Sequence, residues 1–156
     1  MKTRVLVDTS YLLPFFGIRV RELDERTVRE LIDAFNGSEV LYPILMLPEI
    51  MAKISKELSK TGKKLSNDII DAFNSLLGEV DIKLVRPKIS HILRAIQLRL
   101  DGHHDIFDCI AYATAFEEKA LFLTMDSEFI EFLKSKNYDT SLIIDHSAFL
   151  RRILHK

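Results

Sequence analysis

The sequence predicts an α/β domain, a three-layer sandwich in which a central parallel sheet of four to five strands lies between helices. Short apolar, β-branched segments alternate along the chain with longer segments of helical periodicity. Strands that alternate with helices in this way pair in parallel and are covered on both faces. The chain of 156 residues has the length of one domain and contains no repeat, linker or low-complexity segment. We therefore expect a single domain over residues 1–156.

The first half of the chain is expected to begin and end with a strand. Arg4 to Val7 is an apolar, β-branched run, and the segment from Thr9 to Gly17 indicates a short helix interrupted near Pro14. Amphipathic helices follow, each stopped or bent by glycine or proline. In order, the further elements are a helix at residues 22–35, a strand at 39–42, a helix at 44–60 that Pro48 bends or interrupts in its first part, a helix at 66–77 and a strand at 80–85.

The second half continues the alternation. Apolar residues at helical spacing predict a helix after Pro87, and a run of apolar and small residues predicts a second helix close behind it. A short apolar strand then precedes an amphipathic helix, and the pattern repeats once more. The expected elements are helices at residues 90–100 and 106–116, a strand at 120–123, a helix at 127–136, a strand at 141–144 and a final helix at 147–154.

One charged residue interrupts the most apolar helix of the chain. The predicted helix at residues 106–116 is apolar or small on all sides, which is typical of a buried helix. Asp108 lies inside this run, and no basic residue follows it before Lys119. A buried carboxylate is costly unless a cation, a metal or several hydrogen-bond donors compensate it. Asp105 lies three residues earlier and therefore points off the same helical face.

Three further acids are expected to meet Asp108 at one edge of the sheet. Asp8 directly follows the first strand, Asp126 follows the fourth, and Glu49 lies early in the helix that leaves the second. Ligands of an open parallel sheet bind outside the carboxyl ends of its strands. Carboxylates gathered there would raise one another's pKa values unless a divalent cation held them. Oxygen ligands suit Mg²⁺ or Mn²⁺, and such a site activates water for in-line displacement at phosphorus.

These acids also have structural interpretations. Asp8 and Asp126 each precede a predicted helix, where aspartate is a common N-cap. Glu49 stands four residues before Lys53 and can pair with it on the helix surface. A functional role is favoured for Asp108, because its helix offers no cation nearby.

Composition limits the classes of function. No apolar run approaches the length of a membrane span, and the first residues lack the features of a signal peptide. The lone Cys109 excludes an intrachain disulfide and fits a reducing compartment. With a net charge of −1, any binding of nucleic acid must depend on local basic patches. We therefore expect a cytoplasmic protein that has no membrane partner.

Four segments together resemble the PIN-domain (PilT N-terminus) family, in particular its small single-domain VapC-like toxins. They are VLVDTSYLL near the start, LPEI in the middle, DCIAYATA, and LFLTMD followed by Phe129. The resemblance runs along the whole chain. Its most specific part is the eighteen-residue step from Asp108 to Asp126, with Thr124 two residues before the second acid. It implies a sheet of strand order 3-2-1-4-5, in which the first strand lies between the second and the fourth.

The resemblance also implies a function and a set of site residues. Members of the family hydrolyse single-stranded or structured RNA with Mg²⁺ or Mn²⁺ and leave 5′-phosphate and 3′-hydroxyl ends. Many small members are the toxins of type II toxin–antitoxin pairs and many form homodimers, so an RNA substrate, an antitoxin and a second copy are the expected partners. The residues carried over as catalytic are Asp8, Glu49, Asp108 and Asp126. Asp8, Asp108 and Asp126 would hold the metal, with Glu49 and Asp105 as further candidate ligands and with Ser10 and Thr124 in supporting positions.

Basic residues near the acids are candidates for binding the substrate. Lys53 and Lys56 follow Glu49 on one helical face, and Arg19 lies after the first helix. We expect these three cations to contact RNA phosphates. An ordinary solvated helix face is the alternative interpretation for the lysines.

Two adjacent histidines precede the helix that carries Asp108. His103 and His104 lie in a polar turn and lack two further soft ligands, so they are interpreted as a solvated connector and not as zinc ligands.

Two other functions are compatible with parts of the pattern. A catalytically inactive PIN-fold module that binds RNA or protein would keep the fold without the chemistry. A phosphatase with an aspartate nucleophile after the first strand would need a second aspartate two residues later, but Ser10 occupies that position and no glycine-rich phosphate loop is present. A hydrolase that cleaves RNA with a divalent metal is therefore the favoured interpretation.

Overall fold

The computed structural model describes residues 1–78 and 82–154 and contains the predicted α/β architecture. Parallel strands form one sheet of order β3-β2-β1-β4-β5, which confirms the predicted order. The strands are β1 (Thr3–Val7), β2 (Ser38–Pro43), β3 (Ile82–Val85), β4 (Leu121–Leu123) and β5 (Ile143–Ile144). Residues 80 and 81 of the predicted third strand lie outside the described residues.

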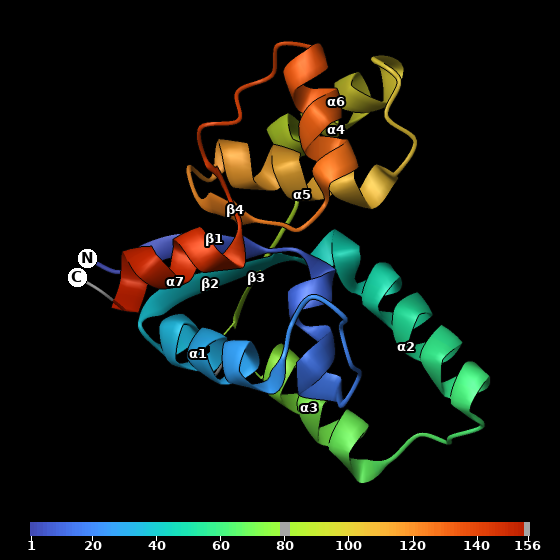
Figure 1. Cartoon of the computed structure of the whole chain (residues 1–156). Coiled ribbons are helices and arrows are strands. Elements are labelled where there is room, and N and C mark those ends of the chain that lie inside the picture. Colours follow the sequence, from blue (N-terminus) through green and yellow to red (C-terminus); the bar gives the residue numbers. More distant parts are fainter. Residues whose placement is uncertain (79–81, 155–156) are drawn as a thin grey trace.

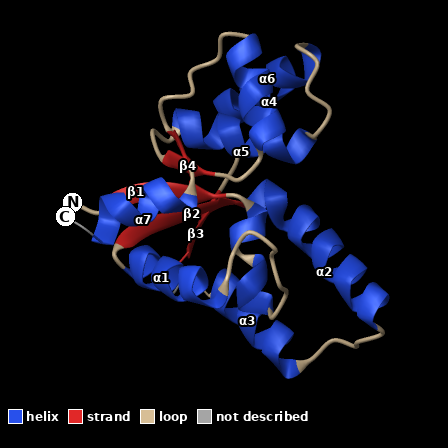
Figure 2. Ribbon diagram, in the orientation of Figure 1, coloured by secondary structure: helices blue, strands red, loops and turns tan. Residues whose placement is uncertain are grey.

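The helices form a layer on each face of the sheet, as Figure 1 shows. They are α1 (Glu25–Asn36), α2 (Leu47–Thr61), α3 (Asn67–Leu77), α4 (Ile89–Leu100), α5 (Ile106–Glu117), α6 (Ser127–Ser135) and α7 (His146–Leu154). Helices α4, α5 and α6 lie on one side, while α1 and α3 lie on the other. Helix α7 packs against α1, where the rings of Phe35 and Phe149 are 5.9 Å apart. Figure 2 shows the strands as one layer between these helices, so the predicted three-layer sandwich is confirmed.

The core is built on the central strand. Val5, Leu6 and Val7 of β1 are fully buried, because helices cover both of its faces. Helix α5 contacts β1, β2 and β4 and presents small buried side chains, among them Ala111 and Ala113. Small side chains allow the helix backbone to lie close to the sheet. This packing fixes the first turn of α5, which carries Asp108, against the middle strands.

Two proline-containing segments differ from the sequence-based expectation. The segment at residues 9–17 forms two 3₁₀ helices (Thr9–Tyr11 and Leu13–Phe16) and ends at Gly17 with a left-handed φ of 73°. A third 3₁₀ helix (Ile44–Met46) follows β2, and Pro48 lies in the first turn of α2. Proline is tolerated in a first turn, because the backbone N–H that it lacks would have no partner there. The predicted disruption near Pro48 is therefore an interruption and not a bend: a 3₁₀ helix ends at Met46 and α2 begins at Leu47.

Helix α2 leaves the sheet at the carboxyl edge and projects beyond it (Figure 1). The chain thus positions the ends of β1, β2 and β4 and the start of α2 along one side of the molecule. Within the described residues, no helix combines the length and the apolar character needed to cross a bilayer.

Candidate active site

The carboxyl ends of β1 and β4 place Asp8 beside Thr124. The Asp8 N–H donates to the carbonyl of Leu123 at 3.0 Å, which extends the parallel β1–β4 ladder by one residue. The Thr124 hydroxyl donates to Asp8 Oδ2 at 3.0 Å, and the Thr9 N–H donates to Oδ1 at 2.8 Å. Asp8 is 9% exposed. Burial, and after it the charge of Glu49, raises the pKa of Asp8 to about 6.

Glu49 is tied to the loop after β1 by buried hydroxyl groups. It lies in the first turn of α2, and its side chain is 12% exposed. The Thr9 hydroxyl donates to Glu49 Oε2 and also lies 2.8 Å from the phenol oxygen of Tyr42, at the end of β2. Lys53 forms an ion pair with Oε1 at 3.0 Å. Thr9 and Tyr42 were not among the predicted site residues. Two features of the sequence could have indicated them: Thr9 directly follows Asp8, and Tyr42 lies at the end of the second predicted strand.

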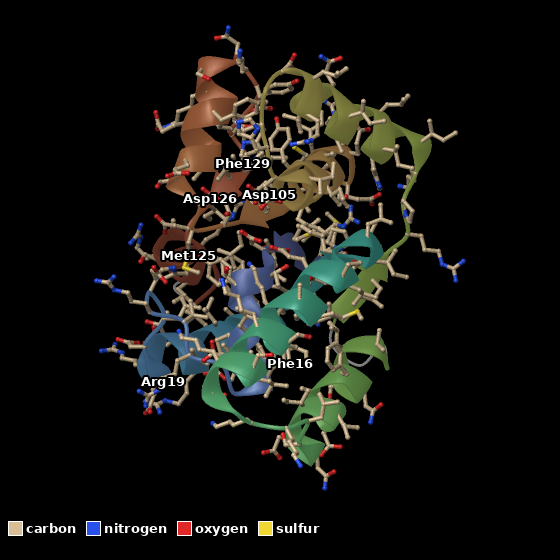
Figure 3. All side chains as sticks on the ribbon, turned by 90° about the vertical axis from the view of Figure 1, so that its right-hand side faces the viewer. Phe16, Arg19, Asp105, Met125, Asp126 and Phe129 are labelled. Carbon is tan, nitrogen blue, oxygen red and sulfur yellow. The ribbon has the colours of Figure 1, made fainter. Side chains whose placement is uncertain are left out.

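The other acids lie at the N-termini of two helices. Asp105 caps α5 by accepting the Phe107 N–H at 2.8 Å, and Asp126 caps α6 by accepting the Phe129 N–H at 2.9 Å. Asp108 lies in the first turn of α5. Figure 3 shows Asp105 and Asp126 labelled in the same region, between α5 and α6. Because the N-terminus of a helix carries partial positive charge, it offsets part of the repulsion among these carboxylates.

Of Asp8 and Asp108, Asp108 has the more strongly raised pKa. Its side chain is 13% exposed, and burial is the largest cause that raises its pKa, to about 8. The charges of Asp105, Asp126, Asp8 and Glu49 raise it further, in this order. All of the predicted acids therefore act on one carboxyl group. Without a cation, Asp108 would be mostly protonated at neutral pH.

His103 contacts Asp108, although its sequence pattern predicts a solvated connector. Its Nε2 and Asp108 Oδ2 share a hydrogen bond of 2.8 Å, and its side chain is 15% exposed. The imidazole packs against the rings of Phe129 and Phe132, with centroid distances of 4.5 and 4.9 Å. The expected solvated connector is therefore wrong for His103. For His104, which is exposed, this expectation is confirmed. The spacing gave no signal, because the turn before α5 brings the imidazole back onto the helix.

The predicted acids have the right chemistry to bind a divalent cation, but their side chains, as the structure describes them, are not arranged around an ion. Among residues 1–78 and 82–154, no three histidine, cysteine or acidic side chains stand close enough to enclose an ion. Each carboxylate is held instead by a protein donor. The donor set consists of carboxylate oxygens, which Mg²⁺ and Mn²⁺ prefer. The raised pKa values of Asp8 and Asp108 mark negative charge that such a cation would compensate.

The predicted cationic residues lie at different distances from the acids. Lys53 is at the site through its ion pair with Glu49, and Lys56 is exposed further along α2. Arg19 lines a groove of about 600 Å³ with Lys63 and other residues at the far end of α2. Figure 3 shows Arg19 well away from Asp105 and Asp126. A phosphate-binding role for these three cations stays a prediction.

Of the two predicted supporting hydroxyl groups, Thr124 contacts an acid directly. Ser10 is half-buried, and within the described part of the chain the hydroxyl that reaches Glu49 belongs to its neighbour Thr9. The supporting role of Ser10 therefore stays a prediction.

Comparison with solved structures identifies the same fold elsewhere. A toxin–antitoxin complex from Klebsiella pneumoniae superposes with a TM-score of 0.62 at 15% identity, over 91% of this chain and 97% of that chain. VapBC2 from Rickettsia felis, bound to a DNA fragment from the promoter, gives 0.62 at 12% identity, over 92% and 98%. VapC20 from Mycobacterium tuberculosis, a toxin that cleaves the sarcin–ricin loop, gives 0.57 at 12% identity, over 81% and 93%. At these identities the likeness shows the fold alone.

The sequence itself carries the signature of a family. No curated protein is significantly similar to the chain in sequence. The family described as PIN domain matches residues 5–133, a span that contains Asp8, Glu49, Asp108 and Asp126. This span covers most of the chain, and the sheet order agrees with the family resemblance found in the sequence. The chain belongs to the PIN-domain family.

Proposed function

We propose that the protein is a metal-dependent endoribonuclease, with Asp8, Asp108 and Asp126 as the residues that hold a Mg²⁺ or Mn²⁺ ion. The observation that carries the proposal is the convergence of the acids on Asp108, whose pKa rises to about 8. Such crowding of buried carboxylates is costly in a stable domain unless a cation binds there. Membership of a family whose members are generally nucleases supports the same conclusion.

The residues of the chain would divide the work of hydrolysis. A bound divalent ion supplies activation of water and stabilisation of charge at the scissile phosphate. Asp8 is held in place by the Thr9 N–H and the Thr124 hydroxyl, so it presents a fixed carboxylate at the end of β1. Glu49 is fixed by Thr9 on one oxygen and Lys53 on the other, and would orient the attacking water or add a ligand. Asp105 is a further candidate ligand at the edge of the site.

A cleavage assay tests this function. Labelled RNA is incubated with wild type, with Asp8→Asn and with Asp126→Asn, in Mn²⁺, Mg²⁺ or a chelator. We expect both variants to lose at least about 100-fold in rate, the scale of removing one preorganised electrostatic contact. Wild type should produce 5′-phosphate ends and should be inactive in the chelator.

The matched control for the assay is Asp24→Asn. Asp24 caps α1 by accepting the Thr27 N–H at 2.7 Å, and asparagine is an equally good N-cap. This variant changes a helix cap without touching the acidic cluster and should cleave like wild type. Equal cleavage by wild type and Asp8→Asn, with and without the metal, would contradict the proposal.

A catalytically inactive RNA- or protein-binding module is the second candidate. It is favoured by one observation: each acid already has a protein donor, and the described residues contain no preformed group of three metal ligands. Isothermal titration with Mn²⁺ separates the two candidates. Saturable binding that Asp108→Asn abolishes supports the nuclease, whereas no binding by wild type supports the module.

We further propose that the protein is the toxin of a toxin–antitoxin pair and that its substrate is single-stranded or structured RNA. The solved complexes from Klebsiella pneumoniae and Rickettsia felis support an antitoxin partner, since both share the fold over more than nine-tenths of this chain. VapC20 from Mycobacterium tuberculosis, which cleaves the sarcin–ricin loop, supports a structured substrate. Growth arrest on expression, relieved by a co-expressed antitoxin and absent with Asp8→Asn, would be the expected result.

We also propose that the protein forms a homodimer through the exposed face of α4. Ile89, Leu93, Ile96 and Leu100 follow one another at steps of four, three and four residues, which is the seam spacing of paired helices. Ile89, Leu93 and Leu100 are 76%, 61% and 75% exposed. Ile92 and Ile96 line an adjacent apolar hollow, so the exposed patch is contiguous. A standard interface, which buries roughly 800 Å² per partner, has an apolar centre of this kind.

Charge also favours a second copy on this face. The two arginines of α4 turn away from the seam: Arg94 pairs with Glu117 at 2.7 Å, and Arg99 donates to the carbonyl of His103 at 2.9 Å. An uncharged, apolar helix face can pair with its own copy about a two-fold axis without repulsion.

Light scattering coupled to size exclusion tests the α4 interface. Wild type should elute as a dimer and Leu93→Lys as a monomer, while Leu65→Lys, which changes an exposed leucine in the turn before α3, should remain dimeric. A monomeric wild type, or a dimeric Leu93→Lys variant, would contradict the assignment of this face.

A further inference from the structure

We propose that His103 is a positioning residue that holds one oxygen of Asp108 and leaves the other for the cation. The proposal rests on the nuclease function proposed above. Asp108 Oδ2 lies 2.8 Å from His103 Nε2. When a cation holds Asp108 in its ionised form, the carboxylate can only accept, so Nε2 then carries the hydrogen and donates it. A carboxylate that binds a metal through one oxygen is commonly fixed by a donor on the other.

The turn before α5 is constructed so that the imidazole cannot move far. Gly102 has a φ of 111°, a conformation that residues with a side chain rarely adopt. Arg99, near the end of α4, donates to the carbonyl of His103 at 2.9 Å and also to the carbonyl of His104. The backbone of the turn is thus tied to α4, and it returns the side chain of His103 over the first turn of α5.

The imidazole is also fixed from the side of α6. The rings of Phe129 and Phe132 are 6.2 Å apart and nearly parallel, with 13° between their planes. Both contact the imidazole, so rotation of the His103 ring is restricted. This fixation has a consequence for Asp108, because a rigid donor defines the direction of the carboxylate that accepts from it.

A purely packing role does not explain the choice of histidine. Phe129 and Phe132 would pack equally well against a phenyl ring or an apolar side chain. The polar atom of the imidazole is used instead on Asp108, a carboxylate for which the described part of the chain contains no other hydrogen-bond partner. The charges of the other predicted acids act on this same carboxyl group. The geometry therefore suits a residue that sets the orientation of a candidate metal ligand.

Substitutions that separate packing from hydrogen bonding test the proposal. His103→Phe and His103→Met keep an apolar or aromatic contact with α6 and remove the donor, whereas His103→Gln keeps an N–H at a similar reach. The affinity of each full-length variant for Mn²⁺ is measured by isothermal titration, and its thermal midpoint is recorded beside it. His104→Phe is the matched control, because His104 is exposed in the same turn.

We expect His103→Phe and His103→Met to bind Mn²⁺ about 10- to 100-fold more weakly than wild type, the loss typical of removing a residue that orients a metal ligand. His103→Gln should retain most of the affinity, and His104→Phe all of it. On RNA, the donor-free variants should lose kcat while KM for the substrate stays unchanged, since His103 is not placed to bind RNA.

The outcomes distinguish the positioning role from the function on which it rests. If wild type binds Mn²⁺ and the donor-free variants bind it within about twofold, His103 has only a packing role and this inference is wrong, while the nuclease proposal stands. Equal affinities of His103→Gln and His103→Met would overturn it in the same way, even if His103→Phe failed to fold. If wild type binds no Mn²⁺, both proposals fail together.

Discussion

Asp8 and Asp126 serve two purposes with one side chain. Asp8 Oδ1 accepts a backbone N–H at the start of a 3₁₀ helix, and Asp126 Oδ1 does the same for α6. The second oxygen of Asp8 accepts from the Thr124 hydroxyl. A capping role and a role in the site are therefore compatible. Because asparagine preserves the cap, a change to asparagine isolates the effect of the charge.

Thr9→Val is predicted to damage both stability and cleavage. The substitution keeps the shape of the side chain but removes the hydroxyl that joins Tyr42 to Glu49. Thr9 is fully buried, and its substitution leaves Glu49 Oε2 without its hydroxyl donor, which should cost about 1–3 kcal/mol in the free energy of unfolding. Glu49 would also lose one of its two tethers, and the cleavage rate should fall.

Urea denaturation and single-turnover cleavage measure these effects. Thr61→Val is the control, because the Thr61 hydroxyl is exposed at the end of α2 and bonds to a backbone carbonyl of its own helix. A Thr9→Val variant as stable and active as Thr61→Val would show that the buried hydroxyl network has no role.

The sequence located the acids more reliably than their partners. Asp8, Asp108 and Asp126 stand at positions where a strand ends or an apolar helix begins, and such positions can be read from periodicity. His103 and Thr9 could not be found in this way. The contact of His103 depends on how the turn before α5 folds back onto that helix. The contact of Thr9 depends on which strand lies beside β1. The spacing of residues along the sequence indicates neither. The partner of a residue in a turn is set by tertiary structure.

Helix α5 illustrates how a tightly packed element positions a site. Ala111 and Ala113 are fully buried, and α5 contacts the middle strands of the sheet. Ala113→Leu is predicted to lower the free energy of unfolding by about 1–3 kcal/mol through overpacking. Because a shift of α5 also moves Asp108, this variant should bind Mn²⁺ more weakly than wild type.

Ala52→Leu is the control for this prediction, since Ala52 is exposed on α2 and leucine is an equally good helix former there. Denaturant unfolding and Mn²⁺ titration give the two readouts. Wild-type stability of Ala113→Leu would mean that α5 packs less tightly than its burial indicates.

The elements differ in how well their sequences define them. Strand β1 and helices α1, α3 and α5 were predicted within a few residues, because long periodic runs and caps such as Ser66 define them. The segment after β1 was predicted as a short helix interrupted near Pro14, and it forms two 3₁₀ helices, the second of which contains Pro14. The sequence left open whether Pro48 bends or interrupts its helix, because the effect of a proline depends on whether it lies inside a helix or at its start.

The whole molecule should lose stability with rising pH when no metal is bound. Asp8 and Asp108 have folded-state pKa values of about 6 and about 8, above the ordinary aspartate value of 3.8. Between pH 3.8, where aspartate titrates in the unfolded chain, and about pH 8, the folded protein therefore binds more protons than the unfolded chain. The contribution of these two groups to the free energy of unfolding is therefore greatest at about pH 4 and below, and it falls as the pH rises from about 4 to 8. In chelator, the thermal midpoint of wild type should be lower at pH 8 than at pH 5.

The dependence of the thermal midpoint on pH can be assigned to Asp108 with one variant and with added metal. Asp108→Asn should flatten it between about pH 6 and pH 8, because that carboxyl group titrates last. Mn²⁺ should raise the thermal midpoint of wild type more at pH 8 than at pH 5, since it binds the ionised form. A midpoint of Asp108→Asn that follows wild type at every pH would contradict this account.

The site draws its acids from segments that are far apart in the order of synthesis. Asp8 is made first, whereas Asp126 emerges only after β4, the strand that pairs with β1. A ribosome-bound chain that ends before Asp126 thus lacks part of the charge needed to capture an ion. If the protein is a nuclease, it cannot attack the messenger or the ribosome that is making it until nearly all of the polypeptide has been translated. The late position of Asp126 in the chain would then protect the cell from the enzyme during translation.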